Sequence, residues 1–158
     1  MLCLVPTPIG NLEDISQRSL RILVEAELIF CEDTRVTKKL LNLLGERNNL
    51  DFSNKEYKSF HSHNEDKILK SLDKETFSKN VVYVSDAGMP CVSDPGATLV
   101  DYCIKNEIPY DVLPGANAIL TAYAMSGFST TTFSFYGFLD HKGVSRASTL
   151  DDILNDDK

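Results

Sequence analysis

Short apolar runs alternate with amphipathic stretches through most of the sequence, and this alternation restricts the fold more than any other feature. Four runs are typical of buried strands: residues 2–6, 28–32, 81–85 and 110–114. The stretches between them carry apolar residues at helical spacing. Strands that alternate with helices pair in parallel and are joined by right-handed crossovers. The sequence therefore predicts an α/β fold, a parallel sheet layered with helices.

Helices are expected in five places: residues 15–26, 35–44, 65–72, a segment that begins at Asp94-Pro95, and 117–125. Gly45 is predicted to end the second helix. Asp94 is predicted to be the N-cap of the fourth, with Pro95 at its first helical position. The last helix is apolar nearly all round, which predicts burial on most sides. A polar interval, 45–58, contains no predicted element.

Composition is that of an ordinary globular protein, with 42% hydrophobic and 25% charged residues. No apolar run is long enough for a membrane span or a signal peptide, so we expect a cytoplasmic protein. The four cysteines form no CxxC pair and are interpreted as reduced, mostly buried thiols: Cys3, Cys31, Cys91 and Cys103.

The net charge of −7 argues weakly against a nucleic-acid partner. The last eight residues carry four acids and one lysine, so residues 1–150 carry 19 acidic and 15 basic groups. An acidic domain of this kind can still bind RNA where its basic residues cluster.

The loops at the ends of the predicted strands are the expected binding edge, because ligands bind outside the carboxyl ends of parallel strands. They read PTPIGN, EDTR, SDAGMPCVSDPG and PGANA, and three of the four combine Gly with Pro. None matches GxGxxG or GxxxxGK[ST], and the Gly-Pro loops contain no Lys or Arg. They suit a neutral or zwitterionic ligand held by main-chain hydrogen bonds.

Six successive motifs carry a resemblance to a known family: VPTPIGNLEDIS, EDTRVTKKLL, HSHNE, SDAGMPCVSDPGATLV, LPGANAILTAYAMSG and FYGFL. In this order they resemble the ribosomal small-subunit methyltransferase I family of the tetrapyrrole-methylase fold class, from about Leu4 to Arg146. The resemblance implies an S-adenosylmethionine-dependent enzyme that methylates the ribose 2′-hydroxyl of a cytidine in 16S rRNA, free or in the assembled small subunit. It also implies a homodimer.

The resemblance further implies the residues that contact the cofactor: Pro8, Gly10, Ser85, Asp86, Ala87, Gly88, Ser93, Pro114, Gly115 and Ala118. It implies an N-terminal α/β cofactor-binding domain over residues 1–127 and the beginning of a second α+β domain over 128–146. Residues 147–158 are expected to be a frayed polar tail. For Asp86, a structural role in which it holds its own turn is preferred over a role as catalytic acid.

Candidates for positioning or deprotonating the ribose hydroxyl lie at the same edge: Glu32, Asp33, Arg35, His61 and Glu65. Asn11, Thr34, His63 and Asn64 are candidate substrate contacts. Asp33 or Thr34 could instead cap the following helix, and Arg35 could bind a phosphate or pair with a local acid. Residues 61–65 could be a solvated loop, and no metal site is expected, because a third ligand at suitable spacing is missing.

The sequence departs from the family in length and at Asp140, where the family usually has Pro. Relatives are about twice as long, so we expect an incomplete form that binds S-adenosylmethionine weakly and does not methylate RNA by itself. Apolar residues around Phe133, Phe135, Tyr136 and Phe138 are then expected to be exposed and to favour self-association.

Two other functions remain open. One is a methyltransferase of the same fold that acts on a tetrapyrrole or a protein, and the other is a non-catalytic cofactor- or RNA-binding fragment.

Overall fold

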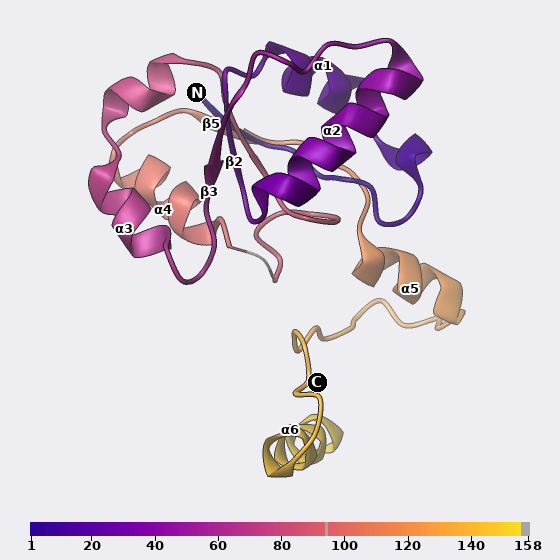
Figure 1. Ribbon diagram of the computed structural model, residues 1–158. Helices are drawn as coiled ribbons and strands as arrows, with labels where there is room; N and C mark the ends of the chain where they lie inside the picture. Colours follow the sequence, from indigo (N-terminus) through magenta and orange to yellow (C-terminus); the bar gives the residue numbers. More distant parts are fainter. Residues whose placement is uncertain (94, 156–158) are drawn as a thin grey trace. The chain divides into compact units, whose positions relative to one another are not determined.

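The structure is a computed structural model that describes residues 1–93 and 95–155 (Figure 1). The chain divides into two compact units, Met1–Ala118 and Ile119–Lys158. The strands are β1 Leu2–Leu4, β2 Leu28–Cys31, β3 Glu56–Ser59, β4 Val81–Val84 and β5 Tyr110–Val112. The helices are α1 Gln17–Glu25, α2 Thr34–Asn48, α3 Glu65–Ser71, α4 Ala97–Lys105, α5 Ala118–Ser126 and α6 Val144–Leu154, with 3₁₀ turns η1 Leu12–Asp14 and η2 Lys74–Ser78.

All five strands pair in parallel, in the order β3-β2-β4-β1-β5, which confirms the predicted α/β class. The connections from β1 to β2 and from β2 to β3 run toward the β3 side of the sheet. The connections from β3 to β4 and from β4 to β5 run toward the β5 side. Because crossovers are right-handed, helices on the first path cover one face and helices on the second path cover the other. Figure 1 shows α1 and α2 on one side of the sheet, and α3 and α4 on the opposite side.

The core has two layers that take alternate residues of each central strand. In β4, Val82 and Val84 pack in the cluster that includes α1 and α2. Val81 and Tyr83 pack in the cluster that includes α4 and residues of α3. Strands buried on both faces need continuous apolar sequence, which explains why β1, β2 and β4 were visible as unbroken apolar runs.

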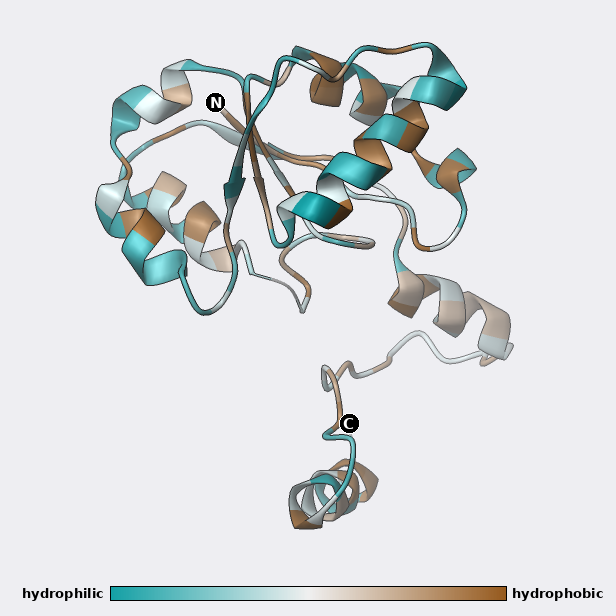
Figure 2. Cartoon of the chain, in the orientation of Figure 1, coloured by the Kyte–Doolittle hydropathy of each residue, from teal (hydrophilic) through white to brown (hydrophobic). Residues whose placement is uncertain are grey.

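Strand β3 was not predicted, because its sequence, EYKS, lies in the polar interval. It forms one edge of the sheet and is the hydrophilic strand in Figure 2. Tyr57 turns toward the α1–α2 layer, while Lys58 and Glu56 form a salt bridge of 3.2 Å. Charged side chains are typical of edge strands, since they discourage pairing with another chain.

The prediction that Gly45 ends the second helix was wrong, since α2 continues to Asn48 and ends at Asn49 in the left-handed conformation (φ 54°). Gly45 is buried inside the helix, where a β-carbon would lie 2.8 Å from the carbonyl oxygen of Leu50. The absence of a side chain at residue 45 lets the helix pack closely against the loop that follows it.

The predicted start of the fourth helix was also wrong. Helix α4 begins at Ala97, with Gly96 at the N-cap position (φ 128°), and Asp94 lies outside the described residues. A β-carbon on Gly96 would lie 2.6 Å from the ring of Tyr83. The buried tyrosine therefore requires a glycine at the point where the helix starts.

Residues 119–155 differ from the sequence prediction in two respects. None of the residues of α5 is buried, although burial on most sides was predicted, and α6 occupies the segment expected to be frayed. An apolar surface indicates that a helix needs a packing partner but does not supply one. Phe133, Phe135, Tyr136 and Phe138 are exposed, as predicted. In the ranges that the structure describes, no helix combines the length and hydrophobicity that a membrane crossing demands.

Replacing Gly45 tests the close packing of α2. Gly45→Ala is expected to lower the free energy of unfolding by about 1–3 kcal/mol, because the added methyl overpacks a buried backbone contact. In an unobstructed helix the same change would stabilise by about 0.5–1 kcal/mol. Urea unfolding measures the difference, with the exposed Asn42→Ala in the same helix as control. A Gly45→Ala protein as stable as the wild type would contradict the packing described.

Candidate functional site at the carboxyl ends of the strands

The parallel pairing brings the carboxyl ends of all five strands to one edge, the lower one in Figure 1. The connection after β2 leads outward through α2, and the connection after the neighbouring β4 leads the other way through α4. Such a switch in direction between adjacent strands leaves a crevice at their carboxyl ends, which is where open α/β sheets bind ligands.

The loops after β1 and β4 are joined by paired backbone groups. The amides of Thr7 and Gly88 each donate to the other residue's carbonyl oxygen, both at 3.0 Å. Two buried hydroxyls add to this: Thr7 Oγ1 donates to the carbonyl of Ser85, and Ser85 Oγ donates to that of Gly88, both at 3.2 Å. These four bonds fix the backbone of residues 85–88.

Two glycines let neighbouring loops approach each other. A β-carbon on Gly115, after β5, would lie 2.5 Å from Cβ of Pro6, after β1. Gly88 has φ +84°, and a β-carbon there would lie 3.2 Å from Ile9. The three Gly-Pro loops after β1, β4 and β5 thus form one assembly. The contact with Pro6 leaves no room for a side chain at residue 115, and the positive φ favours glycine at residue 88.

Carboxylates connect the loops after β2 and β4 across the switch point. The Asp86 amide donates to Glu32 Oε1 at 3.1 Å, and the Asp33 amide donates to Asp86 Oδ1 at 3.3 Å. The Asp86 side chain therefore holds the neighbouring loop, and the prediction that it holds its own turn was wrong. Three acidic side chains gather at this point.

Asp33 is the N-cap of α2, and its Oδ1 accepts the Arg35 amide at 2.8 Å. The Arg35 guanidinium also binds the Asp33 carboxylate, with Nη2 2.6 Å from Oδ2. Hydrogen bonds from Arg35 lower the pKa of Asp33 from 3.8 to about 2. So acidic a carboxyl is a poor general base at neutral pH. Thr34 follows as the first helical residue.

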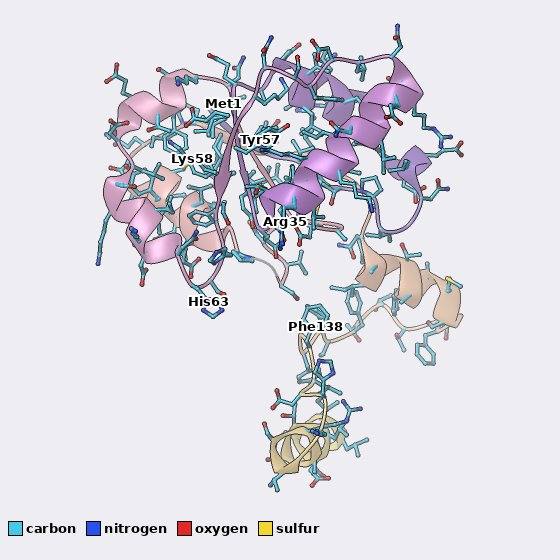
Figure 3. The ribbon with its side chains drawn as sticks, viewed as in Figure 1. Met1, Arg35, Tyr57, Lys58, His63 and Phe138 are labelled. Carbon is cyan, nitrogen blue, oxygen red and sulfur yellow. The ribbon has the colours of Figure 1, made fainter. Side chains whose placement is uncertain are left out.

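The loop after β3 is held by Asn64. Its Oδ1 accepts the His61 amide at 2.9 Å, and its Nδ2 donates to the carbonyl of Ser59 at 3.0 Å. His61 Nδ1 accepts the His63 amide at 3.3 Å. The His63 side chain points away from the sheet at the same edge as Arg35 (Figure 3). The oxygen and the nitrogen of the Asn64 side-chain amide are thus both engaged in holding the loop.

Glu65 lies beside the start of α4, where its Oε2 accepts a hydrogen bond of 2.8 Å from Thr98 Oγ1. A shallow cavity of about 300 Å³ opens next to this contact. Its lining includes Ser62, Glu65, Ser93, Pro95 and Thr98. Thr98 is a contact that sequence reasoning missed, because nothing in the sequence indicates that α3 and α4 begin side by side.

The remaining predicted residues lie around the same edge. Asn11 caps η1 by accepting the Glu13 amide at 3.1 Å, and the space beside Gly10 (φ +134°) is open. Pro8 is half-buried, and Ala87, Pro114 and Ala118 are exposed. Sequence reasoning also missed Thr7 as a bonding residue, although it lies within the PTPIGN loop.

Cys3, Cys31 and Cys103 are buried free thiols, as predicted, and Cys91 is half-buried with φ 67°. Burial raises the pKa of Cys3 and of Cys103 to about 11, so neither is a reactive thiolate at neutral pH. In residues 1–93 and 95–155, no group of three His, Cys, Asp or Glu side chains is placed to hold a metal ion.

The edge combines exposed backbone and small side chains with an acidic switch point. The loops after β1, β4 and β5 contribute no Lys or Arg, while Glu32, Asp33 and Asp86 contribute carboxylates. Negative charge disfavours a phosphate group and favours a ligand with a positive centre. A sulfonium compound that also carries hydrogen-bonding groups fits this combination of carboxylates and exposed main-chain groups.

Replacing Arg35 tests the electrostatics of the Asp33 cap. The pKa of Asp33 is lower in the folded than in the unfolded chain, so the pair stabilises the fold above about pH 4, and this stabilisation is lost as pH falls toward about 2. Arg35→Gln is expected to raise the pKa of Asp33 part of the way from about 2 to 3.8. Carbon-13 NMR titration of the carboxyl measures it.

Lys38→Gln, which removes a cation from the same helix, serves as control and should change the Asp33 pKa far less. A pKa that stays near 2 in Arg35→Gln would show that the backbone bond alone lowers it.

Comparisons with known proteins place the chain in a family. The family model for tetrapyrrole (corrin/porphyrin) methylases matches residues 1–157. A protein named ribosomal RNA small subunit methyltransferase I from Campylobacter fetus is 49% identical over 98% of this chain and 58% of its own length. The protein of the same name from Helicobacter pylori is 46% identical over 98% of this chain and 56% of its own length. The one from Thermotoga maritima is 42% identical over 99% of this chain and 68% of its own length. The chain spans a little more than half the length of the first two.

Solved structures support the same fold. A native uroporphyrin III C-methyl transferase from Thermus thermophilus has a TM-score of 0.54 at 19% identity, covering 77% of this chain and 51% of that one. A structure of this Thermus thermophilus enzyme complexed with S-adenyl homocysteine has a TM-score of 0.53 at 20% identity with the same coverage. At this identity the likeness shows the fold alone. The family match and the identities of 42–49% show more: the chain belongs to the tetrapyrrole methylases and, within them, to the ribosomal RNA small subunit methyltransferase I family.

Proposed function

We propose that this chain forms the S-adenosylmethionine-binding part of an enzyme that methylates the ribose 2′-hydroxyl of a cytidine in 16S rRNA. The observation that carries the proposal is the interlocked set of loops at the carboxyl ends of β1, β4 and β5, with acidic groups at the β2–β4 switch point. The names of the relatives at 41–49% identity support RNA as the substrate class.

The proposed cofactor site uses main-chain groups of the fixed loops, residues 85–88 and 114–116, beside Pro8 and Gly10. Their backbone is held by the Thr7–Gly88 pairing and by the Pro6–Gly115 contact, so its amides and carbonyls are already oriented before a ligand binds. The bound S-adenosylhomocysteine of the fold neighbour supports a ligand of this class. When bound, S-adenosylmethionine supplies a methyl group attached to a positively charged sulfur.

The chain's own residues act chiefly by positioning. Methyl transfer needs the attacking hydroxyl oxygen in line with the methyl carbon, and orientation alone can contribute about 7–11 kcal/mol to such a reaction. His61, Glu65 and Glu32 stand at the edge as groups that can hold or accept the hydroxyl proton. Asp33 is a weaker candidate for this role, because Arg35 lowers its pKa to about 2.

A tetrapyrrole substrate is the competing proposal, since the fold neighbours are uroporphyrin enzymes. Their identity to this chain is 19–20%, compared with 41–49% for the rRNA enzymes, and the closer set favours RNA. We further propose that the protein works as a homodimer in the cytoplasm, where small ribosomal subunits are assembled.

An NMR titration with S-adenosylhomocysteine tests the cofactor site and does not require tight binding. The largest amide shifts are expected at residues 6–10, 85–88 and 114–116. Gly115→Ala is expected to weaken binding about tenfold, because a β-carbon 2.5 Å from Pro6 pushes two of these loops apart. Gly45→Ala, at a close-packed glycine far along α2, controls for general destabilisation. Shifts confined to the amino ends of the strands would refute the site.

A chimera tests the substrate. It joins this chain to the C-terminal part of the Campylobacter fetus relative that lies beyond their aligned region. With tritiated S-adenosylmethionine and small ribosomal subunits, label is expected in 16S rRNA at a cytidine whose 3′ linkage resists alkali, since a methylated 2′-oxygen cannot attack it. Label in a uroporphyrinogen and none in RNA would establish the competing proposal.

A further inference from the structure

We infer that one exposed face of α2 contacts phosphate groups of the RNA substrate. This surface, the α2 basic face, consists of Arg35, Lys38 and Lys39. The inference rests on the proposed function, since it assigns part of the chain to the RNA that the enzyme would methylate. It concerns the protein surface beside the cofactor edge and not the cofactor site itself.

The helix geometry places these three cations together. Residues at i, i+3 and i+4 lie on one face of a helix, and all three side chains are exposed. The opposite face of α2 is buried through Thr37, Leu41 and Leu44. The core contacts of α2 thus fix the orientation of the helix and direct the cations toward solvent.

The α2 basic face begins at the proposed site. Asp33, the N-cap, ends the connection from β2 and is bonded to Asp86 at the switch point, and Arg35 follows two residues later. Figure 3 shows Arg35 at the end of α2 nearest the carboxyl edge of the sheet. From Arg35 to Lys39 the helix rises about 6 Å away from that edge. An RNA strand with one ribose at the edge could therefore continue along these cations.

The charge of this face is only partly neutralised by the protein. Asp33 pairs with Arg35, whose side chain is nevertheless 89% exposed. Within the part of the chain that the structure describes, neither Lys38 nor Lys39 forms a salt bridge with a carboxylate. Lys38 Nζ lies 4.9 Å from the ring centroid of Tyr57, a contact that restrains the side chain without removing its charge.

The first of these cations, Arg35, stands where helix stability would favour an acid. The amino end of a helix carries a partial positive charge, which disfavours Lys and Arg by some tenths of a kcal/mol each. The first turn of α2 contains Arg35 and no acid, and the chain as a whole has a net charge of −7. Residues that oppose a local stability rule often serve function, and a polyanion is the ligand that three clustered cations fit.

An anionic membrane surface is the other polyanion to consider. Interfacial helices bury a wide apolar face in the lipid, whereas the apolar face of α2 is already packed in the core around Leu41 and Leu44. The chain also lacks tryptophan, an anchor common at membrane interfaces. These features favour RNA over lipid.

The test measures the salt dependence of RNA binding by the full chain. The probe is a fluorescein-labelled single-stranded oligoribonucleotide with a cytidine-containing 16S rRNA sequence, titrated at several KCl concentrations. Lys38→Gln/Lys39→Gln is expected to weaken binding and to reduce the slope of log K against log[KCl] by about 1.4, since each phosphate contact with a single strand contributes about 0.7. Gln preserves helix propensity.

Lys70→Gln/Lys74→Gln is the matched control. It removes the same charge from exposed lysines at the end of α3 and in η2, near the amino ends of the strands. Its slope should equal that of the wild type. Equal losses in both double variants would indicate a net-charge effect and overturn the inference, as would an unchanged slope for Lys38→Gln/Lys39→Gln or an absence of RNA binding by the wild-type chain.

Two further measurements separate this inference from the proposed function. If the α2 variant binds RNA like the wild type while the chimera still methylates 16S rRNA, the α2 basic face is refuted and the function stands. If the variant loses RNA affinity but the chimera labels only a uroporphyrinogen, the face binds RNA and the proposed reaction is wrong. Tighter binding to phosphatidylserine vesicles than to RNA, lost in the same variant, would assign the face to lipid.

Discussion

The parallel pairing of β1 with β4 is the constraint on which the rest of the structure depends. Both strands are buried on two faces. Beyond them the amide of Val5 donates to the carbonyl of Tyr83, and an isolated antiparallel bridge then joins Thr7 to Gly88. Because the pairing extends into the loops, residues 85–88 cannot move independently of residues 5–7. The rigid core, together with the hydroxyls of Thr7 and Ser85, therefore fixes the backbone that would contact a ligand.

Four of the five strands and the binding edge at their carboxyl ends were predictable from sequence, whereas the edge strand β3 was not. A strand buried on both faces must be apolar throughout, which makes β2 and β4 conspicuous. The edge strand β3 needs only Tyr57 for the core and has charged or polar residues at its other positions, so its sequence resembles a loop. The prediction for Gly45 was wrong for a related reason. Glycine occurs both at helix ends and at close backbone contacts, and only the tertiary structure shows which of the two applies at residue 45.

The residues of the candidate site were predictable in type but not in role. Asp33 and Asp86 are 53 residues apart, and their hydrogen bond exists because β2 and β4 are neighbours in the sheet. Sequence periodicity gives strands but not their order, so it could not show that Asp86 holds the loop after β2. The capping role of Asp33 is local and was foreseen as an alternative, since it depends only on the start of α2.

The distribution of charge around α2 accounts for how an acidic chain could serve an RNA substrate. Carboxylates at the β2–β4 switch point would attract a positively charged sulfonium, and the same carboxylates would repel RNA if nothing compensated them. Arg35 neutralises Asp33 locally, and Lys38 and Lys39 extend positive charge away from the edge. Since physiological salt screens interactions between exposed charges that are more than about 8–10 Å apart, a polyanion passing along α2 would respond to these nearby cations more than to the net charge of the whole chain.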